Sequence, residues 1–281
     1  MMAWDYGNAY EDYPIQSGTA VFKDGSVLKT HDIFNPLPEF MLKADLVFVD
    51  PPWNQGNIST FYMKAEKVQP SGNFESFCDR LFDCIKMINP HVCYVEIGKQ
   101  YLSNFMERMN KIYKYVVFYN STYYHNKRNL CYVVRGSNKY KKPSLDGMDE
   151  EDIIEWICQN EEYSCIGDLC MGRGLVAVNA HKAGKLFVGT EMNHKRLSVT
   201  LQRLSDIGAE YSLESPNLIR ESREKKKLTQ GEVANIIGLT LRQYQRYESG
   251  ALNIGAINFR SGILLAHILD IKPETLLAQS L

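Results

Sequence analysis

The sequence predicts an α/β domain, which we expect over residues 1–209, followed by a smaller all-α domain over residues 216–281. Apolar runs of strand length alternate with amphipathic segments of helical period, at the spacing of parallel βαβ units. After Gly208 this alternation gives way to a series of short helical segments. The chain has 281 residues, of which 44% are hydrophobic, so it can bury a sizeable core.

Composition excludes several classes of protein. The formal net charge is −1, so a nucleic-acid partner has to be found in local charge patterns. The chain has no apolar run near the roughly 18 residues of a membrane span and no basic segment before one, so we expect no membrane span, no signal peptide and a cytoplasmic protein without a membrane partner. The seven cysteines are odd in number and form no C-x-x-C pair, so we expect reduced core thiols and no metal site.

The first quarter of the chain predicts a hairpin, a strand and a long loop. Residues 1–16 are aromatic and acidic without periodicity, and we expect an arm. Residues 19–22 and 27–30 flank an Asp-Gly turn signal and predict a β-hairpin. Residues 46–49 are apolar and rich in β-branched side chains, which predicts a buried strand that ends at proline. The polar residues 54–73 are expected to form a long loop that covers the neighbouring site.

The following segments supply the rest of the α/β domain. Residues 74–88 have apolar side chains at helical spacing and end at Asn89-Pro90. The other expected elements are a strand at 92–97, a helix to about 113, strands at 115–119 and 130–134, a helix at 150–158, a strand from 166, a helix at 175–183 and a strand at 186–191. Their alternation predicts parallel βαβ units, and residues 210–217 are expected to link the two domains.

The stretch Asp50-Pro51-Pro52-Trp53 lies where the first buried strand ends, which is where open α/β sheets bind ligands. The prolines have no N–H, so the loop offers carbonyl acceptors in a preset direction, and Asp50 adds a carboxylate. Two acceptors without a donor suit an exocyclic amine and would localise its lone pair. Trp53 supplies a flat face on which a base can stack. Taken alone, the four residues equally suit a strand followed by a solvated turn.

A second stretch, from Asp168 to Gly174, joins a short strand to a helix, and the next strand ends at Glu191. Gly172 and Gly174 permit close approach of the backbone, and an acid at the end of the next strand can accept both hydroxyls of a ribose. This order and spacing are typical of a nucleoside-cofactor site. The N-terminus of the helix could serve a carboxylate of the cofactor.

The two stretches resemble the motifs of the β class of amino-methyltransferases, in which the catalytic motif precedes the cofactor motif, as it does here. The resemblance covers residues 27–204 and implies a Rossmann-like fold, S-adenosylmethionine as cofactor and a flipped base in DNA as substrate. It implies a catalytic motif formed by Asp50, Pro51, Pro52 and Trp53. In this motif Asp50 and the Pro51 carbonyl bind the amine, and Trp53 stacks on the base. It also implies cofactor contacts from Asp50, Asp168, Cys170, Gly172, Gly174 and Glu191.

Two departures from the family pattern matter. The family usually has Asp-Pro-Phe where this chain has Asp168-Leu169-Cys170, so an apolar contact with the cofactor is missing. The insert that reads DNA sequence is reduced to residues 136–148. We expect adenine N6 as the target, because family members that act on cytosine N4 more often begin the catalytic motif with Ser than with Asp. A cytosine N4 enzyme is one alternative, and a DNA-binding transcriptional regulator with a catalytically silent domain is another.

Residues 110–145 contain eight Lys or Arg side chains and no acid, interleaved with tyrosines. Basic side chains hold phosphates and tyrosines stack on bases, so this segment is the best local candidate for a DNA surface in the α/β domain. The candidates are concentrated in the loop at 123–128 and are Tyr123, Tyr124, Lys127 and Arg128. An equally good interpretation for any single residue is that the tyrosines belong to the core and the lysines are merely solvated.

The C-terminal domain resembles the Cro/repressor type of helix-turn-helix. The resemblance is carried by Leu228-Thr229-Gln230, Val233-Ala234, Gly238-Leu239 and Tyr247-Glu248-Ser249-Gly250, and it extends to the C-terminus. In that fold the second helix of the motif enters the major groove of DNA. The resemblance therefore makes Thr240, Arg242, Gln243 and Arg246 candidates for contact with DNA. A helical module for protein interaction or for homodimerisation is the alternative.

Overall fold

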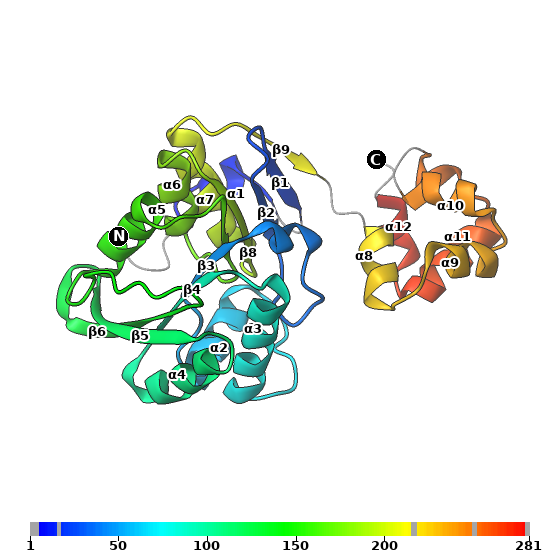
Figure 1. The fold of residues 1–281 in the computed structure, drawn as a ribbon. Helices are drawn as coiled ribbons and strands as arrows, with labels where there is room; N and C mark the ends of the chain where they lie inside the picture. The colour runs from blue at the N-terminus through cyan, green and yellow to red at the C-terminus, as the bar shows by residue number, and fades with distance from the viewer. Residues whose placement is uncertain (1–5, 16–17, 215–217, 249–251, 279–281) are drawn as a thin grey trace. The chain divides into compact units, whose positions relative to one another are not determined.

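The computed structural model of the protein describes residues 6–15, 18–214, 218–248 and 252–278. The chain divides into an α/β unit, Met1–Glu214, and a helical unit, Ser215–Leu281. The predicted organisation, an α/β domain followed by a smaller all-α domain, is confirmed (Figure 1). The functional domain limits of 1–209 and 216–281 stay a prediction.

Within the described residues, the α/β unit is built on a nine-stranded sheet in the order β5-β6-β4-β3-β7-β8-β2-β1-β9. The strands are β1 Thr19–Phe22, β2 Val27–Thr30, β3 Leu46–Val49, β4 Val92–Ile97, β5 Tyr115–Tyr123, β6 Asn126–Ser137, β7 Cys165–Asp168, β8 Leu186–Glu191 and β9 Tyr211–Glu214. The five strands from β4 to β2 run parallel to one another. Antiparallel pairs complete both edges, with β6 and β5 beyond β4 and with β1 and β9 beyond β2.

Two expectations about this sheet are wrong. The segments at 115–119 and 130–134 belong to the longer strands β5 and β6, which form an antiparallel hairpin instead of parallel units. Their connection is short and includes Tyr124 and His125, both with positive φ, and a connection of this length permits only antiparallel pairing. The segment expected to link the two domains contains strand β9. In this strand Tyr211 lies opposite Phe22, and the two ring centroids are 5.4 Å apart.

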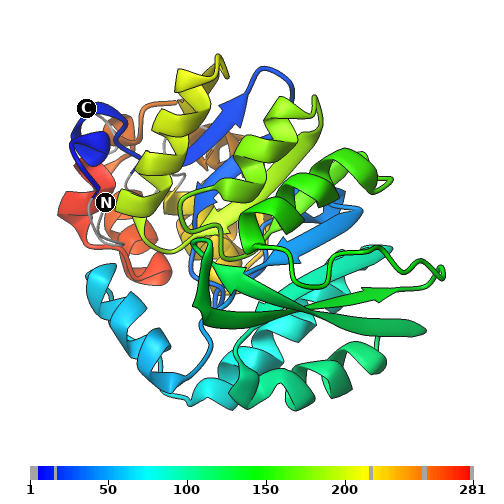
Figure 2. The same ribbon diagram turned by 90° about the vertical axis from the view of Figure 1, so that its left-hand side faces the viewer.

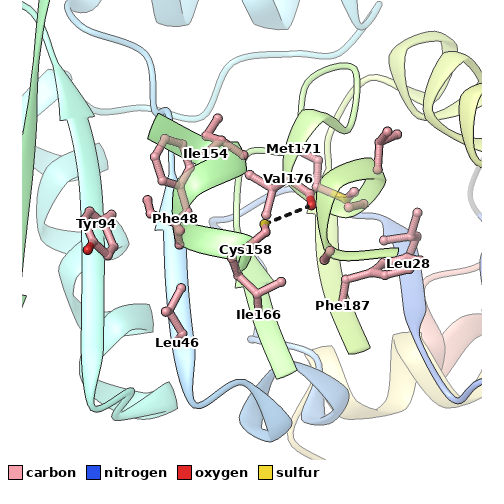
Figure 3. Close-up of a cluster of buried hydrophobic side chains, with 14 of the residues drawn as sticks. Leu28, Leu46, Phe48, Tyr94, Ile154, Cys158, Ile166, Met171, Val176 and Phe187 are labelled. Carbon is pink, nitrogen blue, oxygen red and sulfur yellow. Dashed lines mark hydrogen bonds between the residues drawn. The ribbon is translucent and has the colours of Figure 1, made fainter. Parts of the chain in front are cut away.

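Helices cover both faces of the sheet (Figure 2). They are α3 Phe74–Ile88 and α4 Leu102–Asn110 on one face, and α5 Glu150–Asn160, α6 Leu175–Lys182 and α7 His194–Asp206 on the other, with short 3-10 turns at Glu39–Lys43 and Lys99–Tyr101. Strand β3 divides its side chains by alternation. Leu46 and Phe48 join the cluster under α5 and α6 (Figure 3), whereas Val47 and Val49 join the cluster under α3. All four side chains are buried, which explains the uninterrupted apolar run.

The expected long loop at 54–73 contains a helix instead, α2 Gln55–Lys64. Asn54 caps it, since its side chain accepts a hydrogen bond of 3.0 Å from the Asn57 amide. Ile58 and Tyr62 lie one turn apart and are both buried. The other apolar residues of the helix, Phe61 and Met63, are not buried, so the helical period of the apolar side chains is weak and the prediction missed the helix.

The N-terminal segment is not a free arm. Residues 1–5 and 16 lie outside the described residues, but Ala9–Asp12 form a short helix, α1, that packs against α7. All seven cysteines are free thiols, and each except Cys170 is buried. Within the described ranges, no helix is long and apolar enough to cross a membrane.

The helical unit packs short helices around its own apolar core. They are α8 Leu218–Lys225, α9 Gln230–Ile236, α10 Leu241–Glu248, a 3-10 turn at Ile254–Ala256, α11 Phe259–Leu269 and α12 Pro273–Ala278. Val233, Tyr244 and Leu265 are completely buried at the centre. A capping box starts α9, in which Thr229 and Glu232 exchange side-chain and backbone hydrogen bonds. Gly238, with φ of +73°, makes the turn before α10.

Candidate functional site

A cavity of about 1120 Å³ lies at the carboxyl ends of the parallel strands. Asp50 directly follows β3, Asp168 ends β7 and Glu191 ends β8, so neighbouring strands bring the two predicted motifs to one edge of the sheet. The predicted residues that line the cavity are Asp50, Pro51, Pro52, Trp53, Tyr123, Tyr124, Arg128, Asp168, Cys170, Gly172 and Glu191. Lys127 and Gly174 are not part of its wall.

The carboxyl group of Asp50 is held from two sides. Trp53 donates its indole N–H to one oxygen at 3.0 Å, and the Tyr123 hydroxyl donates to the other oxygen. Burial raises the pKa of Asp50, while the hydrogen bonds from Tyr123 and Trp53 favour its ionised form. The carboxyl group is therefore oriented as an acceptor before any ligand arrives.

Trp53 is fixed by its surroundings. Its ring meets that of Tyr123 edge to face at 5.3 Å between centroids. Its backbone N–H donates to the Asn57 side chain at 3.2 Å. Gly98 lies beneath the indole, and a Cβ atom there would come within 2.9 Å of the ring. The absence of a side chain at Gly98 thus gives Trp53 its place beside Asp50.

The glycine-rich turn is tied to the next strand. The Gly172 amide donates to Glu191 Oε2 at 2.8 Å, and the Asn193 amide donates to Glu191 Oε1 at 2.8 Å. Gly172 and Gly174 both have positive φ, which favours glycine. A Cβ at Gly174 would lie 2.2 Å from the Thr200 side chain, so this glycine allows α6 to approach α7. Gly174 therefore contributes to the packing of α6 against α7 and does not line the cavity.

Burial raises the pKa of each carboxyl group at this edge. The pKa of Asp168 rises to about 8, with the charges of Asp50 and Glu191 adding to the effect of burial. Its Oδ1 accepts a hydrogen bond of 3.0 Å from the Cys170 amide. The pKa of Glu191 also rises with burial, although the nearby Arg196 offsets part of this. Together these groups give the cavity a site that favours a cation.

Two further acids belong to this cluster, and the sequence interpretation missed both. Glu150, at the start of α5, lines the cavity with only 8% of its surface exposed. Burial first, and then the charges of Asp50 and its neighbours, raise its pKa to about 9. Glu96, in β4, is fully buried. Glu96 could have been found in the sequence as a single acid inside an apolar run. Glu150 could not, because it is one of several acids at a helix start, where acids are usually solvated.

Other missed residues line the cavity near α2. Asp32 accepts a hydrogen bond of 2.8 Å from the hydroxyl of Tyr62. His31 follows β2, and burial lowers its pKa to about 3, so the ring is neutral. The Arg196 guanidinium lies 5.0 Å from the centre of the Phe61 ring. Phe61 and Tyr62 belong to α2. This segment was predicted from the sequence as a loop, and therefore neither residue was given a role.

The β5–β6 hairpin carries the predicted aromatic and basic residues. Tyr123 points to Asp50, whereas Tyr124 is 66% exposed, and Lys127 and Arg128 are also exposed. Asp149 anchors the turn, since one of its oxygens accepts from the Thr122 hydroxyl and the His125 amide, each at 2.8 Å. The start of α5 thus sets the position of Tyr123.

In the helical unit, the four predicted DNA-contacting residues are exposed at the N-terminal side and along α10. Gln243 caps α10, because its side-chain oxygen accepts from the Thr240 amide at 3.0 Å and the Thr240 hydroxyl at 2.9 Å. Arg242 and Arg246 lie one turn apart on the same helix. Tyr244 is buried in the core of the helical unit, and Tyr247 is partly buried against that core.

A buried ion pair ties the helical unit together. Glu248 has 1% of its side chain exposed and accepts hydrogen bonds from Arg223 at 2.7 and 2.8 Å and from Gln230 at 2.8 Å. Burial alone would raise the pKa of Glu248, but the hydrogen bonds from Arg223 and Gln230 lower it. The pair joins α8, α9 and α10.

Comparison with known proteins gives a family match for the helical unit and structural similarities for the chain. The profile of the helix-turn-helix family matches residues 219–276. No curated protein sequence matches the chain.

Three of the similar solved structures differ from this chain in nearly all residues. The SAM complex of M1.HpyAVI has 13% identity and a TM-score of 0.44, covering 63% of this chain and 98% of that one. TTHA0409 from Thermus thermophilus, named as a candidate DNA modification methylase, has 12% identity and a TM-score of 0.44, covering 60% of this chain and 90% of that one. The cytosine-N4-specific PvuII DNA methyltransferase has 11% identity and a TM-score of 0.48, covering 80% of this chain and 93% of that one. At these identities the similarities assign no chemistry to this chain.

Proposed function

We propose that this protein transfers a methyl group from S-adenosylmethionine to an exocyclic amino nitrogen of a base in DNA, with adenine N6 as the preferred acceptor. The observation that carries the proposal is the meeting of both motifs in one cavity. The acceptor loop from Asp50 to Trp53 and the glycine turn beside Glu191 line the same space. A site for an amine and a site for a nucleoside therefore lie next to each other.

The cavity suits the cofactor in charge and in size. When bound, S-adenosylmethionine supplies an electrophilic methyl carbon on a positively charged sulfur. Buried acids that repel one another, such as Asp168 and Glu150, are stabilised by a cation of this kind. Glu191 is fixed by two backbone amides, and each of its oxygens keeps a lone pair for a ribose hydroxyl. The volume of about 1120 Å³ exceeds the roughly 300–1,000 Å³ of a single-ligand pocket, which leaves room for a base.

The chain's own groups then act on the acceptor amine. Asp50 accepts one hydrogen of the amine and the Pro51 carbonyl accepts the other, which localises the nitrogen lone pair. That lone pair would form the new N–C bond as the C–S bond of bound S-adenosylmethionine breaks, with the electrons of the broken bond staying on sulfur. The amine loses one proton, for which the Asp50 carboxylate is the adjacent base. Holding both partners in one cavity supplies the orientation that the reaction needs.

DNA is the proposed substrate because a helix-turn-helix unit follows the catalytic unit in the same chain. Arg242 and Arg246 are exposed on α10, the helix that enters the major groove in this motif. A base in a duplex has to leave the stack to reach a cavity of this kind. We prefer adenine over cytosine because the catalytic motif begins with Asp50, and the motif of cytosine N4 enzymes more often begins with Ser.

The test is incubation of the full chain with labelled S-adenosylmethionine and unmethylated duplex of mixed sequence, followed by digestion to nucleosides. Label in N6-methyladenine is the expected result, and label in N4-methylcytosine would reassign the base. No incorporation at high enzyme concentration would contradict methyl transfer and would favour a DNA-binding regulator. Mapping at base resolution of DNA from cells that express the protein then gives the sequence context.

A further inference from the structure

A second carboxyl group lies directly behind Asp50. Val49 of β3 is paired with Val95 of β4, so Asp50 and Glu96 occupy the next positions on adjacent strands. Glu96 is fully buried, and neither of its carboxyl oxygens accepts a hydrogen bond of ordinary geometry from the described residues. A buried carboxyl group without such a partner costs stability, so its presence beside Asp50 needs an explanation.

Tyr123 lies between these two carboxyl groups. Its hydroxyl donates to Asp50 Oδ2, and it is also close enough to Glu96 to act on its ionisation. Burial and the charge of Asp50 raise the pKa of Glu96 well above its usual range, while hydrogen bonding by Cys131 and Tyr123 works in the opposite direction. Because Asp50 and Glu96 follow paired residues on adjacent strands, the hydroxyl that donates to Asp50 lies beside a second potential acceptor.

Of the two groups that occupy Asp50, Tyr123 is the one that can leave. The Trp53 indole is held against Gly98 and its backbone is tied to Asn57. Tyr123 instead ends β5, next to a register shift in the pairing with β6 and to a turn with positive φ. With the backbone on both sides still held by Asp149, a rotation of the Tyr123 side chain would carry its hydroxyl away from Asp50.

We propose that the Tyr123 hydroxyl is a placeholder for the acceptor amine on Asp50, and that Glu96 is the positioning residue that receives this hydroxyl when the amine displaces it. The proposal rests on the methyl-transfer function above. Before substrate binds, Tyr123 keeps water off Asp50 and orients its carboxyl group. After substrate binds, Glu96 gains the hydrogen bond that Asp50 gives up, so no buried hydroxyl is left without a partner.

The exchange selects for the substrate's chemistry. Only a group that can donate a hydrogen bond can replace the O–H of Tyr123 on a carboxylate, and on a base the exocyclic amine is such a group. A base without an exocyclic amine leaves Tyr123 on Asp50 and the site closed. Tyr123 and Glu96 thereby disfavour bases that lack an exocyclic amine, whatever the DNA sequence around the base.

The first test is a double-mutant cycle on methyl transfer by the full chain, using Glu96→Leu, Tyr123→Phe and both together. Glu96→Leu is expected to lower kcat at least tenfold with KM for DNA unchanged, and to have no further effect in the Tyr123→Phe background. Glu96→Gln, which keeps an acceptor oxygen, is expected to stay within threefold of the unaltered protein. Equal effects of Glu96→Leu in both backgrounds would show a purely structural role. Tyr10→Phe, at an exposed position of α1 outside the cavity wall, is the matched control and should change nothing.

The second test needs no catalysis and no substitution at Glu96. With Trp4 and Trp156 changed to Phe, fluorescence reports on Trp53 alone, whose ring touches Tyr123. With S-adenosylhomocysteine saturating the cofactor site, 2′-deoxyadenosine should change the emission of Trp53, and purine 2′-deoxyriboside, which lacks the amine, should not. Identical responses to the two nucleosides would overturn the placeholder even if methyl transfer is observed. A selective response without methyl transfer would retain the placeholder and overturn the catalytic function.

Discussion

The carboxyl groups at the sheet edge and Glu248 of the helical unit are all buried, but they have opposite surroundings. Asp168 and Glu150 are crowded by other acids, and their pKa values rise to about 8 and about 9. Glu248 is met by Arg223 and Gln230, and its pKa is lowered. The first arrangement costs stability in the free protein, whereas the second holds three helices together.

The same contrast occurs within the α/β unit. Glu161 is buried away from the cavity and is paired with Arg135 and Lys141 at 3.1 and 2.7 Å. Burial would raise the pKa of Glu161, but hydrogen bonds from Lys141 and Tyr94 lower it. Away from the cavity, this buried acid is paired with basic side chains. Buried acids with raised pKa values are concentrated where we propose that a cationic cofactor and an amine bind.

The largest effect is expected from Arg223→Ala, which would leave the Glu248 carboxylate buried without its basic partner. Breaking one side of a buried pair costs about 3–5 kcal/mol, which is comparable to the whole stability of a unit this small. The helical unit should unfold while S-adenosylmethionine still binds the α/β unit. Melting of the full chain followed by circular dichroism, with calorimetry for the cofactor, checks this. Arg220→Ala is the control, because Arg220 also faces Glu248 but at 3.7 Å and half exposed.

Next in size is Asp50→Ala, which removes one proposed acceptor of the developing charge on the amine. The turnover number should fall about 10²- to 10³-fold, on the scale of losing one partner of a transition-state charge. DNA affinity should stay nearly constant, as measured by fluorescence anisotropy beside the methylation rate. Asp83→Ala, on the exposed surface of α3, is the matched control. Loss of DNA binding in proportion to rate would contradict the role given to Asp50.

Glu191→Ala removes the proposed acceptor for the ribose of the cofactor. Losing hydrogen bonds to a charged group costs about 1.5–3 kcal/mol, so S-adenosylmethionine should bind about ten- to a hundredfold more weakly. Catalysis should largely recover at saturating cofactor. Calorimetric titration gives the dissociation constant, and Glu210→Ala, exposed and paired with Lys23 at the far edge of the sheet, is the comparison. An unchanged constant would show that the ribose lies elsewhere.

A smaller effect is expected in the helical unit from Arg242→Ala and Arg246→Ala. If these side chains contact bases, each change should cost about 1–3 kcal/mol and alter which sites are methylated. If they contact phosphate alone, binding should weaken evenly across sequences, with a shallower dependence on salt. Arg260→Ala removes the same charge from α11 and serves as control. Deleting residues from 216 onward should weaken methylation more strongly, and an unchanged rate would exclude a targeting role.

The two units should also differ in the pH dependence of their stability. Asp168 keeps its proton in the folded state up to about pH 8, whereas an unfolded Asp loses it near 4. The α/β unit should therefore lose stability as pH rises from about 4 to 8, by at most about 1.4 kcal/mol per pH unit for each such proton. Glu248 has the opposite sign, because its lowered pKa gives stability above about pH 4 that is lost on further acidification.

Melting of the full chain from pH 3 to 9 tests this difference. Asp168→Asn should flatten the dependence for the α/β unit, and added cofactor should do the same by favouring the ionised acids. Parallel pH curves for the two units would mean that their buried acids do not differ in the way described.

Much of the fold could be predicted because its signals are local. The strand at 186–191 has the predicted limits, since an apolar run is bounded by Gly184-Lys185 before it and by polar residues after it. Helix α3 likewise starts and ends as predicted, with Asn73 capping it and Asn89 in the left-handed region. In both cases the hydrophobic period and the capping residues agree.

What the sequence could not predict depends on contacts between distant segments. Tyr123 was expected on the DNA surface because its neighbours are basic, but the Asp149 anchor turns it toward Asp50. Glu96 was predicted only as part of the strand at 92–97, and its relation to Asp50 exists only through the β3–β4 register. The turn after Asp168 was predicted from its glycines, but the reason for Gly174 is the side chain of Thr200 in another helix.

The pairing of β1 with β9 has a consequence for how the chain is made. Residue 22 lies opposite residue 211, so the first strand of the α/β unit completes its hydrogen bonds only with the last. At roughly 5–20 residues per second, synthesis of the intervening chain takes on the order of 10–40 s. During that interval the N-terminal hairpin lacks both β9 and its parallel neighbour β8. Such unpaired edges are where a nascent chain pairs with other chains. We therefore expect the α/β unit to complete its fold late, with the greatest need for chaperones before residue 214 has left the ribosome.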